Sequence, residues 1–226
     1  MDTVELYCIN FMDEERRIKM LTRFEGHKLT IHFVDPVYTT DSRIDPRLDK
    51  RVTSIMLQHL DSIRHFYETT TKSYAIICED DILLSKHFAT DLPNILECYT
   101  ELKLDVLLLG YLLPFPLTKD MPEFKLLKEM EDYTFYDFPY HLWGSQMYLI
   151  HREHAKFLLD KYTMTYATAD LGRPYNPDWT LTKDQKKALL YPMLALEEGI
   201  EKSNHEMQSE YHLKCFLVNY KSDVYF

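Results

Sequence analysis

The stretch Tyr74–Ser85, YAIICEDDILLS, joins an apolar run to three consecutive carboxylates and then becomes apolar again. Its first five residues are apolar on both faces of a pleated strand, which is typical of a central parallel strand covered by helices. In open α/β sheets, ligands bind beyond the carboxyl ends of such strands. Glu79, Asp80 and Asp81 therefore stand where a ligand is expected.

The three carboxylates favour a divalent cation. Three adjacent like charges repel one another, and a shared cation removes that cost. Oxygen ligands suit Mg²⁺ or Mn²⁺, which also bind substrate phosphates. On an extended backbone, Glu79 and Asp81 point to one side as a carboxylate pair, and Asp80 points to the other. The alternative is that all three acids are solvated and cap the next element.

Length and charge limit the possible classes. The chain has 226 residues, of which 46% are hydrophobic, and we expect one domain over residues 1–226. A formal net charge of −10 disfavours nucleic acid and anionic membranes as partners. We expect neither a secretory signal nor an anchor at the start, and no segment approaches the roughly 20 apolar residues of a membrane span.

The cysteines and glycines exclude further classes of protein and of binding site. The four cysteines are widely spaced and form no CxxC pair, so we expect reduced, mostly buried thiols and a cytoplasmic location. The five glycines are also isolated, which excludes a P-loop and a GxGxxG dinucleotide turn. The phosphates of a bound nucleotide would need a metal or a few placed cations instead.

Apolar periodicity predicts alternating strands and helices up to Gly110. The expected strands are 4–10, 28–37, 74–78 and 105–110, and the expected helices are a helix from Asp13, 48–66 and 88–102. This order predicts an α/β domain with a mostly parallel central sheet flanked by helices. A mixed C-terminal part follows, with strands in 132–138, 145–152, 191–198 and 213–220 and a helix at 153–162.

Five segments carry a family resemblance. Besides IICEDDILLSKHF, they are YCINFMDEERRIKM (7–20), SIMLQHLDSIRHF (54–66), HLWGSQMYLIHREHAKFLL (141–159) and NPDWTL (176–181) followed by YPMLALEE (191–198). In this order they resemble glycosyltransferase family 25, the lipopolysaccharide-biosynthesis and procollagen galactosyltransferase-like enzymes, including short bacterial and large-DNA-virus versions. The family's usual Gly-Cys is replaced by Ser54 and Ile55, and Gln58 stands where the family has a serine before its histidine, here His59.

The resemblance implies a GT-A type, Rossmann-like fold and a metal-dependent, hexosyltransferase-like enzyme. It would move a sugar from a nucleotide-diphosphate sugar, expected to be UDP-linked, to a hydroxyl of a glycan or glycoprotein acceptor with inversion. Mn²⁺ or Mg²⁺ is the expected cofactor. Asp81 is the first expected metal ligand, Glu79 a metal or ribose ligand, and Asp80 a catalytic and sugar-contacting residue. His205 in the tail is a candidate third metal ligand, and a simple exposed tail is the alternative.

Four further residues are candidates for binding the nucleotide sugar. Asn10, after the first strand, is placed by the resemblance near the base or ribose, with ordinary turn chemistry as the alternative. Arg17, or its neighbour Arg16, could reach the diphosphate, with a solvated helix face as the alternative. His141 and Trp143 occupy a loop where an indole stacks on a sugar, and the alternative for Trp143 is a lid over the core.

Asp178 is the candidate general base that deprotonates the acceptor hydroxyl, and a turn-capping aspartate is the alternative. His59 falls on the apolar stripe of its helix and is expected to be a core histidine. Two other classes remain open. One is a non-catalytic nucleotide-sugar or glycan-binding module of the same fold, and the other is a metal-dependent phosphoryl-transfer or hydrolytic enzyme. The oligomeric state is not predicted.

Overall fold

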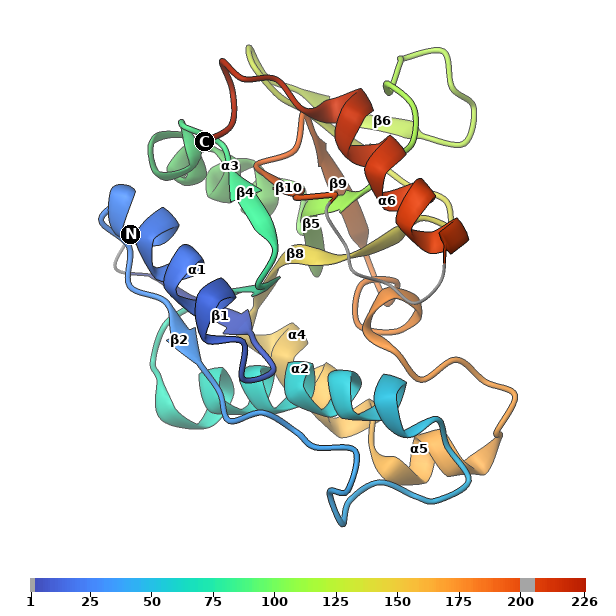
Figure 1. Ribbon diagram of the computed structural model, residues 1–226. Coiled ribbons are helices and arrows are strands. Elements are labelled where there is room, and N and C mark those ends of the chain that lie inside the picture. Colours follow the sequence, from blue (N-terminus) through green and yellow to red (C-terminus); the bar gives the residue numbers. More distant parts are fainter. Residues whose placement is uncertain (1–2, 200–205) are drawn as a thin grey trace.

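The computed structural model describes residues 3–199 and 206–226, and Figure 1 shows an α/β arrangement of strands between helices. The strands are β1 (Val4–Ile9), β2 (His32–Phe33), β3 (Tyr74–Glu79), β4 (Ile82–Leu84), β5 (Val106–Leu112), β6 (Lys125–Glu129), β7 (Thr134–Asp137), β8 (Trp143–His151), β9 (Lys187–Tyr191) and β10 (Ala195–Glu197). Over the described residues, eight of them form one sheet in the order β2-β1-β3-β8-β5-β9-β7-β6, and β4 pairs with β10 in a second sheet.

Six of the eight strands of the large sheet run in the same direction, and β7 and β8 run against them. Strand β1 pairs in parallel with both β2 and β3, and β5 pairs in parallel with β9. Strand β8 lies between β3 and β5 and runs antiparallel to both. The first residues of β8 therefore reach the same edge of the sheet as the last residues of β3 and β5.

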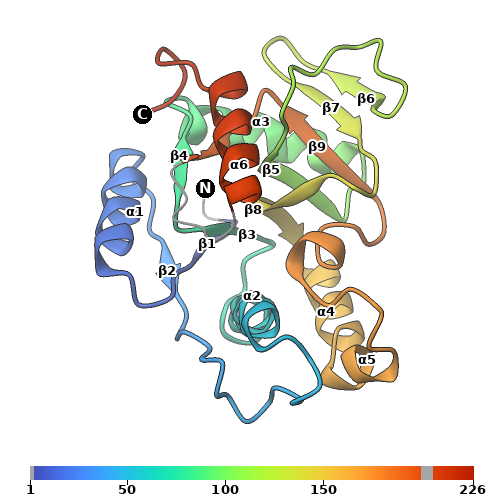
Figure 2. The same cartoon turned by 45° about the vertical axis from the view of Figure 1, so that its right-hand side comes forward.

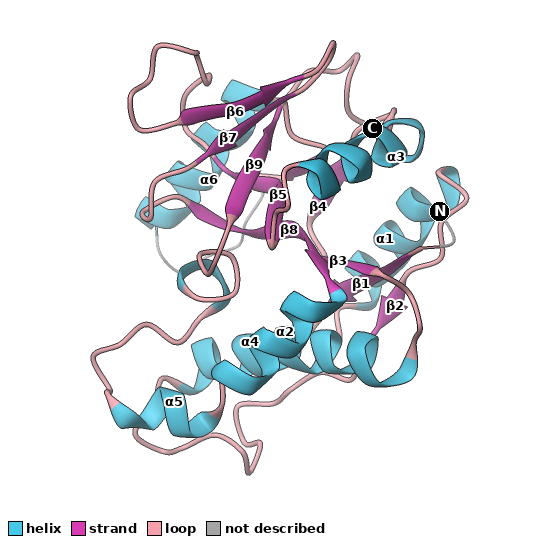
Figure 3. Cartoon of the chain, turned by 180° about the vertical axis from the view of Figure 1, so that it is seen from behind, coloured by secondary structure: helices cyan, strands magenta, loops and turns pink. Residues whose placement is uncertain are grey.

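Helices cover both faces of this sheet (Figures 2 and 3). The helices are α1 (Glu14–Gly26), α2 (Lys50–Thr69), α3 (Phe88–Glu101), α4 (Arg152–Lys161), α5 (Met164–Ala169) and α6 (Glu206–Asn219), with a 3₁₀ turn η1 (Pro177–Trp179). Aspartates cap the N-termini of α1 and α2. Asp13 accepts a hydrogen bond from the backbone N–H of Arg16 at 3.0 Å, and Asp49 accepts one from the backbone N–H of Val52 at 2.8 Å. Such N-caps satisfy donors that a helix leaves unpaired.

Alternation along the strands divides the core into two layers. Tyr7 and Ile9 of β1 pack on the side of α2 and α4, whereas Leu6 and Cys8 pack on the side of α1 and α3. Strand β3 divides its side chains in the same way, with Ile77 on the first side and Cys78 on the second. The central strands are thus covered on both faces, as their continuous apolar sequence predicts.

The predicted fold class is confirmed, and three local predictions need correction. The strand expected over residues 191–198 is reduced to β10, because Tyr191 already ends β9. The strand expected over residues 28–37 shrinks to the two residues of β2. The strand expected at residues 213–220 is wrong, because those residues belong largely to helix α6. The buried residues His212 and Cys215 are three apart, which places them on one face of the helix, whereas Leu213 and Leu217 are exposed.

Other sequence expectations are confirmed. All four cysteines are buried and free of disulfide bonds. His59 is a buried core histidine whose Nδ1 lies 3.0 Å from the hydroxyl of Tyr148, and burial lowers its pKa to about 3. Among the described residues, no helix is both long enough and apolar enough to cross a bilayer.

Candidate functional site

The three acids lie at a tight junction between two strands. Strand β3 ends at Glu79, Asp80 and Asp81 form a turn, and β4 begins at Ile82. The expected alternation requires extended backbone, so it does not continue through this turn. The expectation that Asp80 points away from Asp81 is therefore wrong, and both carboxylates contact the same cation, the guanidinium of Arg16.

Asp80 is held by two side chains that come from the end of β1 and the start of α1. Its Oδ2 accepts a hydrogen bond from Asn10 Nδ2 at 2.6 Å, and its Oδ1 accepts one from Arg16 Nη1 at 2.9 Å. Asn10 is fixed in turn by Gln58 of α2, whose Nε2 donates to the Asn10 carbonyl at 3.0 Å. Because β1 and β3 are parallel neighbours, with Ile9 opposite Glu79, their carboxyl ends bring Asn10 and Asp80 together.

Arg16, and not Arg17, is the arginine that faces the acids. Arg16 Nη1 lies 3.3 Å from Asp81 Oδ2 in addition to its contact with Asp80, and its side chain remains 33% exposed. Arg17 instead places its guanidinium 4.2 Å from the ring centroid of Phe33. The sequence offers both arginines, and only the helical phase distinguishes them.

Asp81 carries the clearest electrostatic anomaly of the site. Burial raises its pKa to about 7, and the nearby carboxylate of Glu197 adds to the rise while the cation of Arg16 opposes it. Its Oδ1 is buried and makes no hydrogen bond to any described residue. A buried carboxylate oxygen without a partner is costly, so this atom is the one most in need of a ligand.

Glu79 connects the acids to β8. Its Oε1 accepts a hydrogen bond from the hydroxyl of Ser145 at 2.8 Å. Burial raises the Glu79 pKa well above its usual range, and the charges of Asp81 and Asp178 raise it further, whereas the Ser145 hydrogen bond lowers it. Ser145 lies in one of the five segments that resemble the family, but nothing in the sequence predicts its contact with Glu79. The contact arises because β8 lies antiparallel between β3 and β5.

Asp178 lies beside this pair, at η1. Its Oδ1 accepts hydrogen bonds from the backbone N–H groups of Gly144 at 2.8 Å and Ser145 at 3.0 Å. Its Oδ2 makes no hydrogen bond to another described residue, so one oxygen is fixed and one is open. Glycine at position 144 lets the start of β8 pack closely on β5, because a Cβ there would lie 2.5 Å from Leu108 Cδ1.

Glu197 is a member of the acidic cluster that sequence reasoning missed. It is only 3% exposed and lies opposite Ile82 in the β10–β4 pair, which brings it close to the turn of Asp80 and Asp81. Its Oε2 lies 3.2 Å from Nδ1 of His212 on α6. A buried glutamate is unusual. The apolar residues just before Glu197 were the one feature of the sequence from which its burial could have been predicted.

The remaining candidate residues lie at the surface or outside the part of the chain that the structure describes. His141 is exposed, with its Nε2 3.7 Å from Glu123, and Trp143 is 41% exposed beside Trp179. Trp143 is therefore not a buried lid over the core. His205 lies outside the described residues.

The donor chemistry fits a hard divalent cation, since the site offers carboxylate oxygens, including the unpartnered Asp81 Oδ1. Within residues 3–199 and 206–226, no three His, Cys, Asp or Glu side chains converge as a set of metal ligands. Magnesium-type sites commonly combine one or two carboxylates with water and substrate phosphates. Glu79 and Asp81 would suit such a site.

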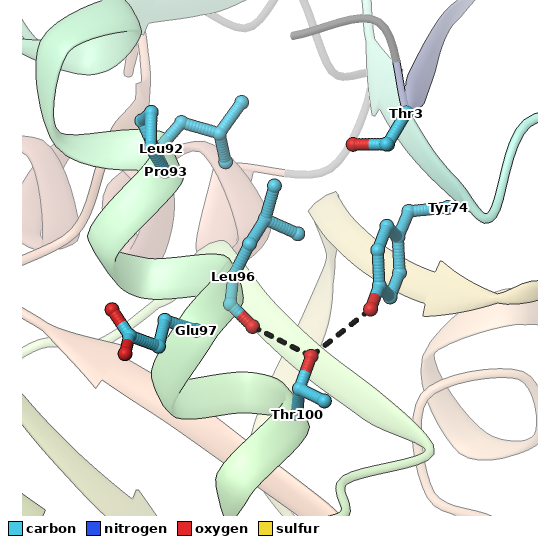
Figure 4. Close-up of a pocket in the computed structure, with 7 residues that line it drawn as sticks. All are labelled: Thr3, Tyr74, Leu92, Pro93, Leu96, Glu97 and Thr100. Atoms are coloured by element: carbon cyan, nitrogen blue, oxygen red, sulfur yellow. Dashed lines mark hydrogen bonds between the residues drawn. The ribbon is translucent and has the colours of Figure 1, made fainter.

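Two cavities lie elsewhere. One of about 390 Å³ is lined by Thr3, Tyr74 and residues of α3 (Figure 4). Tyr74 is the first residue of β3, whereas the three carboxylates lie at the last residue of β3 and just beyond it. This cavity is therefore at the amino end of β3, away from the acids. Another, of about 460 Å³, lies between the β1–β2 edge and α2. Neither is lined by the acidic cluster.

Comparison with known proteins supports the fold. No protein-family model and no curated protein sequence matches the chain. The chain is similar to the structure of a glycosyltransferase involved in the glycosylation of the major capsid of PBCV-1, with a TM-score of 0.51 and 7% identity over 92% of this chain and 98% of that one. It is also similar to a mannose-1-phosphate geranyltransferase from Thermus thermophilus, with a TM-score of 0.45 and 10% identity over 83% of this chain and 73% of that one. The first similarity confirms an α/β fold of GT-A type.

Proposed function

We propose that the chain is a glycosyltransferase that moves a sugar from a nucleotide-diphosphate sugar to a hydroxyl of a glycan or glycoprotein. The observation that carries the proposal is the network of Asn10, Asp80, Arg16 and Asp81 at the carboxyl ends of the parallel strands β1 and β3. This edge is where open α/β sheets bind nucleotides. The GT-A type fold and the resemblance to glycosyltransferase family 25 support the same assignment.

The donor nucleotide is proposed to lie along the Asn10 side of the network. Phe11 and Tyr38 are 54% and 47% exposed, and their ring centroids lie 5.4 Å apart next to Asn10, so they offer a stacking surface for the base. Arg16 provides a partly exposed cation for the diphosphate in a chain without a glycine-rich loop. UDP is the nucleotide we expect.

Asp80 is proposed to act by positioning as well as by contact. Each of its oxygens already binds one partner, and a carboxylate oxygen can accept a second hydrogen bond, for example from a ribose hydroxyl. Its charge also holds Arg16 at the place where the diphosphate would arrive. A role for Asp80 in catalysis, as the sequence suggested, would work through this arrangement.

Mn²⁺ or Mg²⁺ would be held by Asp81 and Glu79 and would supply Lewis-acid stabilisation of the departing diphosphate. His205 remains a proposed third ligand. The raised pKa values of Asp81 and Glu79 mean that protons compete for the same oxygens. Donor binding should accordingly strengthen as both carboxylates ionise.

Asp178 is proposed as the general base. Its open Oδ2 can accept the proton of the acceptor hydroxyl, while its Oδ1 is anchored by two N–H donors from the start of β8. Inversion of the sugar's configuration is proposed from the resemblance to glycosyltransferase family 25, and it would require this base to act on the face of the sugar opposite the departing diphosphate. The chain's own residues thus divide into a group that holds the leaving nucleotide and a group that activates the acceptor.

A thermal-shift screen tests the proposal. UDP-glucose, UDP-galactose and GDP-mannose are each added with and without Mn²⁺, and nucleoside diphosphate release is then followed for any donor that binds. A Mn²⁺-dependent shift with one donor and release of its diphosphate is the expected result, and both are lost in Asp81→Asn. Binding without turnover would indicate a non-catalytic module instead, and hydrolysis of nucleotides that carry no sugar would indicate a phosphohydrolase.

A further inference from the structure

A cluster of three aromatic side chains stands at the surface next to Asp178. The ring centroids of Tyr140 and Trp179 lie 5.3 Å apart with planes tilted by 36°, and those of Trp143 and Trp179 lie 5.7 Å apart at 69°. Tyr140 is 57% exposed and Trp143 is 41% exposed. We call these three residues the aromatic shelf.

Hydrogen bonds and a lysine contact fix the three rings of the aromatic shelf. The Tyr140 hydroxyl donates to the Trp179 carbonyl at 3.2 Å, which joins the loop before β8 to η1. Lys183 lies beneath, with its Nζ 5.6 Å from the Trp179 ring centroid and 4.8 Å from that of Phe138, and it donates a hydrogen bond to the Leu142 carbonyl. These contacts hold the rings in place while Tyr140 and Trp143 stay exposed.

The shelf borders the proposed general base on two sides. Trp143 immediately precedes Gly144, whose N–H binds Asp178, and Trp179 immediately follows Asp178. A ring lying on the shelf would therefore be close to Asp178. The surface proposed for the nucleotide base, Phe11 and Tyr38, is formed by a different part of the chain at the Asn10 side of the site.

We propose that Tyr140, Trp143 and Trp179 form the acceptor subsite and bind a neutral sugar ring of the acceptor glycan, an inference that rests on the proposed transferase function. The apolar face of a sugar stacks on an aromatic ring, and its hydroxyls need hydrogen-bonding partners at the rim. Asp178 Oδ2 is an acceptor for such hydroxyls. Neither indole N–H donates a hydrogen bond to another described residue, so both remain as donors.

Charge distinguishes a neutral sugar from an anionic ligand. The ammonium group of Lys183 is engaged by a backbone carbonyl, and that of Lys187 is engaged by Asp137 and by the Phe138 carbonyl, each at 2.6 Å. The carboxylate of Asp178, by contrast, has an open oxygen. The charge of Asp178 would repel an anionic ligand, whereas a hydroxylated neutral ring would not be repelled.

The chain offers a specific reporter for this subsite. Its two tryptophans, Trp143 and Trp179, are both in the shelf, so intrinsic tryptophan fluorescence reports on the shelf alone. The experiment titrates the full chain with glucose, galactose, mannose, lactose and maltose, each with and without UDP and Mn²⁺. We expect a saturable change in tryptophan fluorescence with at least one of these saccharides.

Variants make the test specific. Tyr140→Ala removes one ring face and should weaken that saccharide about three- to tenfold, the size of effect expected for one aromatic contact. Tyr140→Phe keeps the face and should bind nearly as the wild type does. Tyr220→Ala is the matched control, because Tyr220 is also exposed (38%) and stacked, on Phe216 of α6, and it should leave the titration unchanged. Circular dichroism checks that each variant is folded.

The outcomes separate this inference from the proposed function. If no saccharide changes the fluorescence under either condition, or if Tyr140→Ala binds as well as the wild type, the acceptor assignment is rejected. Donor binding in the thermal-shift screen without saccharide binding would reject the shelf alone. Saccharide binding without any donor binding would retain the shelf as a sugar site and reject the transferase. Concentration-dependent self-association abolished by Tyr140→Ala would show a protein interface in its place.

Discussion

Glu79 and Asp178 are joined through a single residue, Ser145, which donates its hydroxyl to Glu79 at 2.8 Å and its backbone N–H to Asp178 at 3.0 Å. The two carboxylates lie far apart in the sequence, and the start of β8 brings them together. In the proposed reaction Glu79 belongs to the leaving-group side and Asp178 to the acceptor side. Ser145 therefore sets the relative position of the two halves of the site.

Replacing Ser145 by alanine removes the contact to Glu79 and keeps the contact to Asp178. Because the Ser145 hydrogen bond lowers the Glu79 pKa, its loss should shift the acidic limb of the pH–activity profile to higher pH. We expect about a ten- to hundredfold loss of transfer near pH 7, since one charge-assisted hydrogen bond is worth roughly 1.5–3 kcal/mol. Ser54→Ala, which removes a different buried hydroxyl, should keep the wild-type profile. An unchanged profile in Ser145→Ala would contradict this role.

Asp178→Asn separates proton transfer from positioning. The amide oxygen can still accept the N–H groups of Gly144 and Ser145, so the local structure should persist, but the side chain no longer takes up a proton. Transfer is expected to fall about 10²- to 10⁴-fold, the usual contribution of a general base. Calorimetric titration with the donor should show no loss of affinity. A variant that retains transfer would leave Asp178 with only a capping role.

Two adjacent arginines provide an internal comparison. Arg16 contacts Asp80 and Asp81, whereas Arg17 lies over Phe33. Arg16→Gln should weaken UDP binding more than Arg17→Gln does, by about tenfold or more, because only Arg16 places a cation at the acidic turn. Calorimetry with UDP and Mn²⁺ measures both variants. Equal losses would indicate that Arg17 also reaches the nucleotide.

Asp81→Asn should change stability in a pH-dependent way. The Asp81 pKa is raised to about 7 in the folded chain from an ordinary value of 3.8, so the neutral carboxyl favours folding below pH 3.8 and this contribution is lost as pH rises through 7. Without metal, the variant should therefore match the wild type near pH 4 and be more stable at pH 8. The difference in the free energy of unfolding should be up to about 4 kcal/mol, at roughly 1.4 kcal/mol per pKa unit.

Urea unfolding in the presence of a chelator, at pH 4 and pH 8, measures this difference. The control variant is Asp132→Asn, which makes the same substitution at an exposed carboxylate. Added Mn²⁺ should stabilise the wild type at pH 8 and leave Asp81→Asn unaffected. A destabilised Asp81→Asn at pH 8 would instead indicate that the ionised carboxylate, paired with Arg16, supports the fold.

The fold class and the location of the acids followed from local sequence, because strand periodicity and burial on both faces are local properties. The contact of Ser145 with Glu79 did not, since it depends on β8 entering the sheet antiparallel between β3 and β5. Glu197 was missed for a related reason, because its place beside the acids comes from pairing between β10 and β4. Both contacts require tertiary topology.

The choice between Arg16 and Arg17 depended on helix phase, which shifts by about 100° for one residue and is fixed by the Asp13 cap. The side-chain directions of Asp80 and Asp81 could not be predicted from strand alternation, because these two residues form a turn and not an extended strand. The helix at the C-terminus was mistaken for a strand because a short apolar run does not by itself distinguish the two.

The reversed direction of β8 has a consequence for how such a chain diversifies. Residues proposed to hold the nucleotide come from positions 10–81, and those proposed to receive the acceptor come from positions 140–179, in the loop before β8, the start of β8 and η1. Apart from Ser145, which contacts both halves of the site, substitutions in the second region can alter which recipient is modified while the donor pocket keeps its sequence. The two specificities are thereby free to evolve separately.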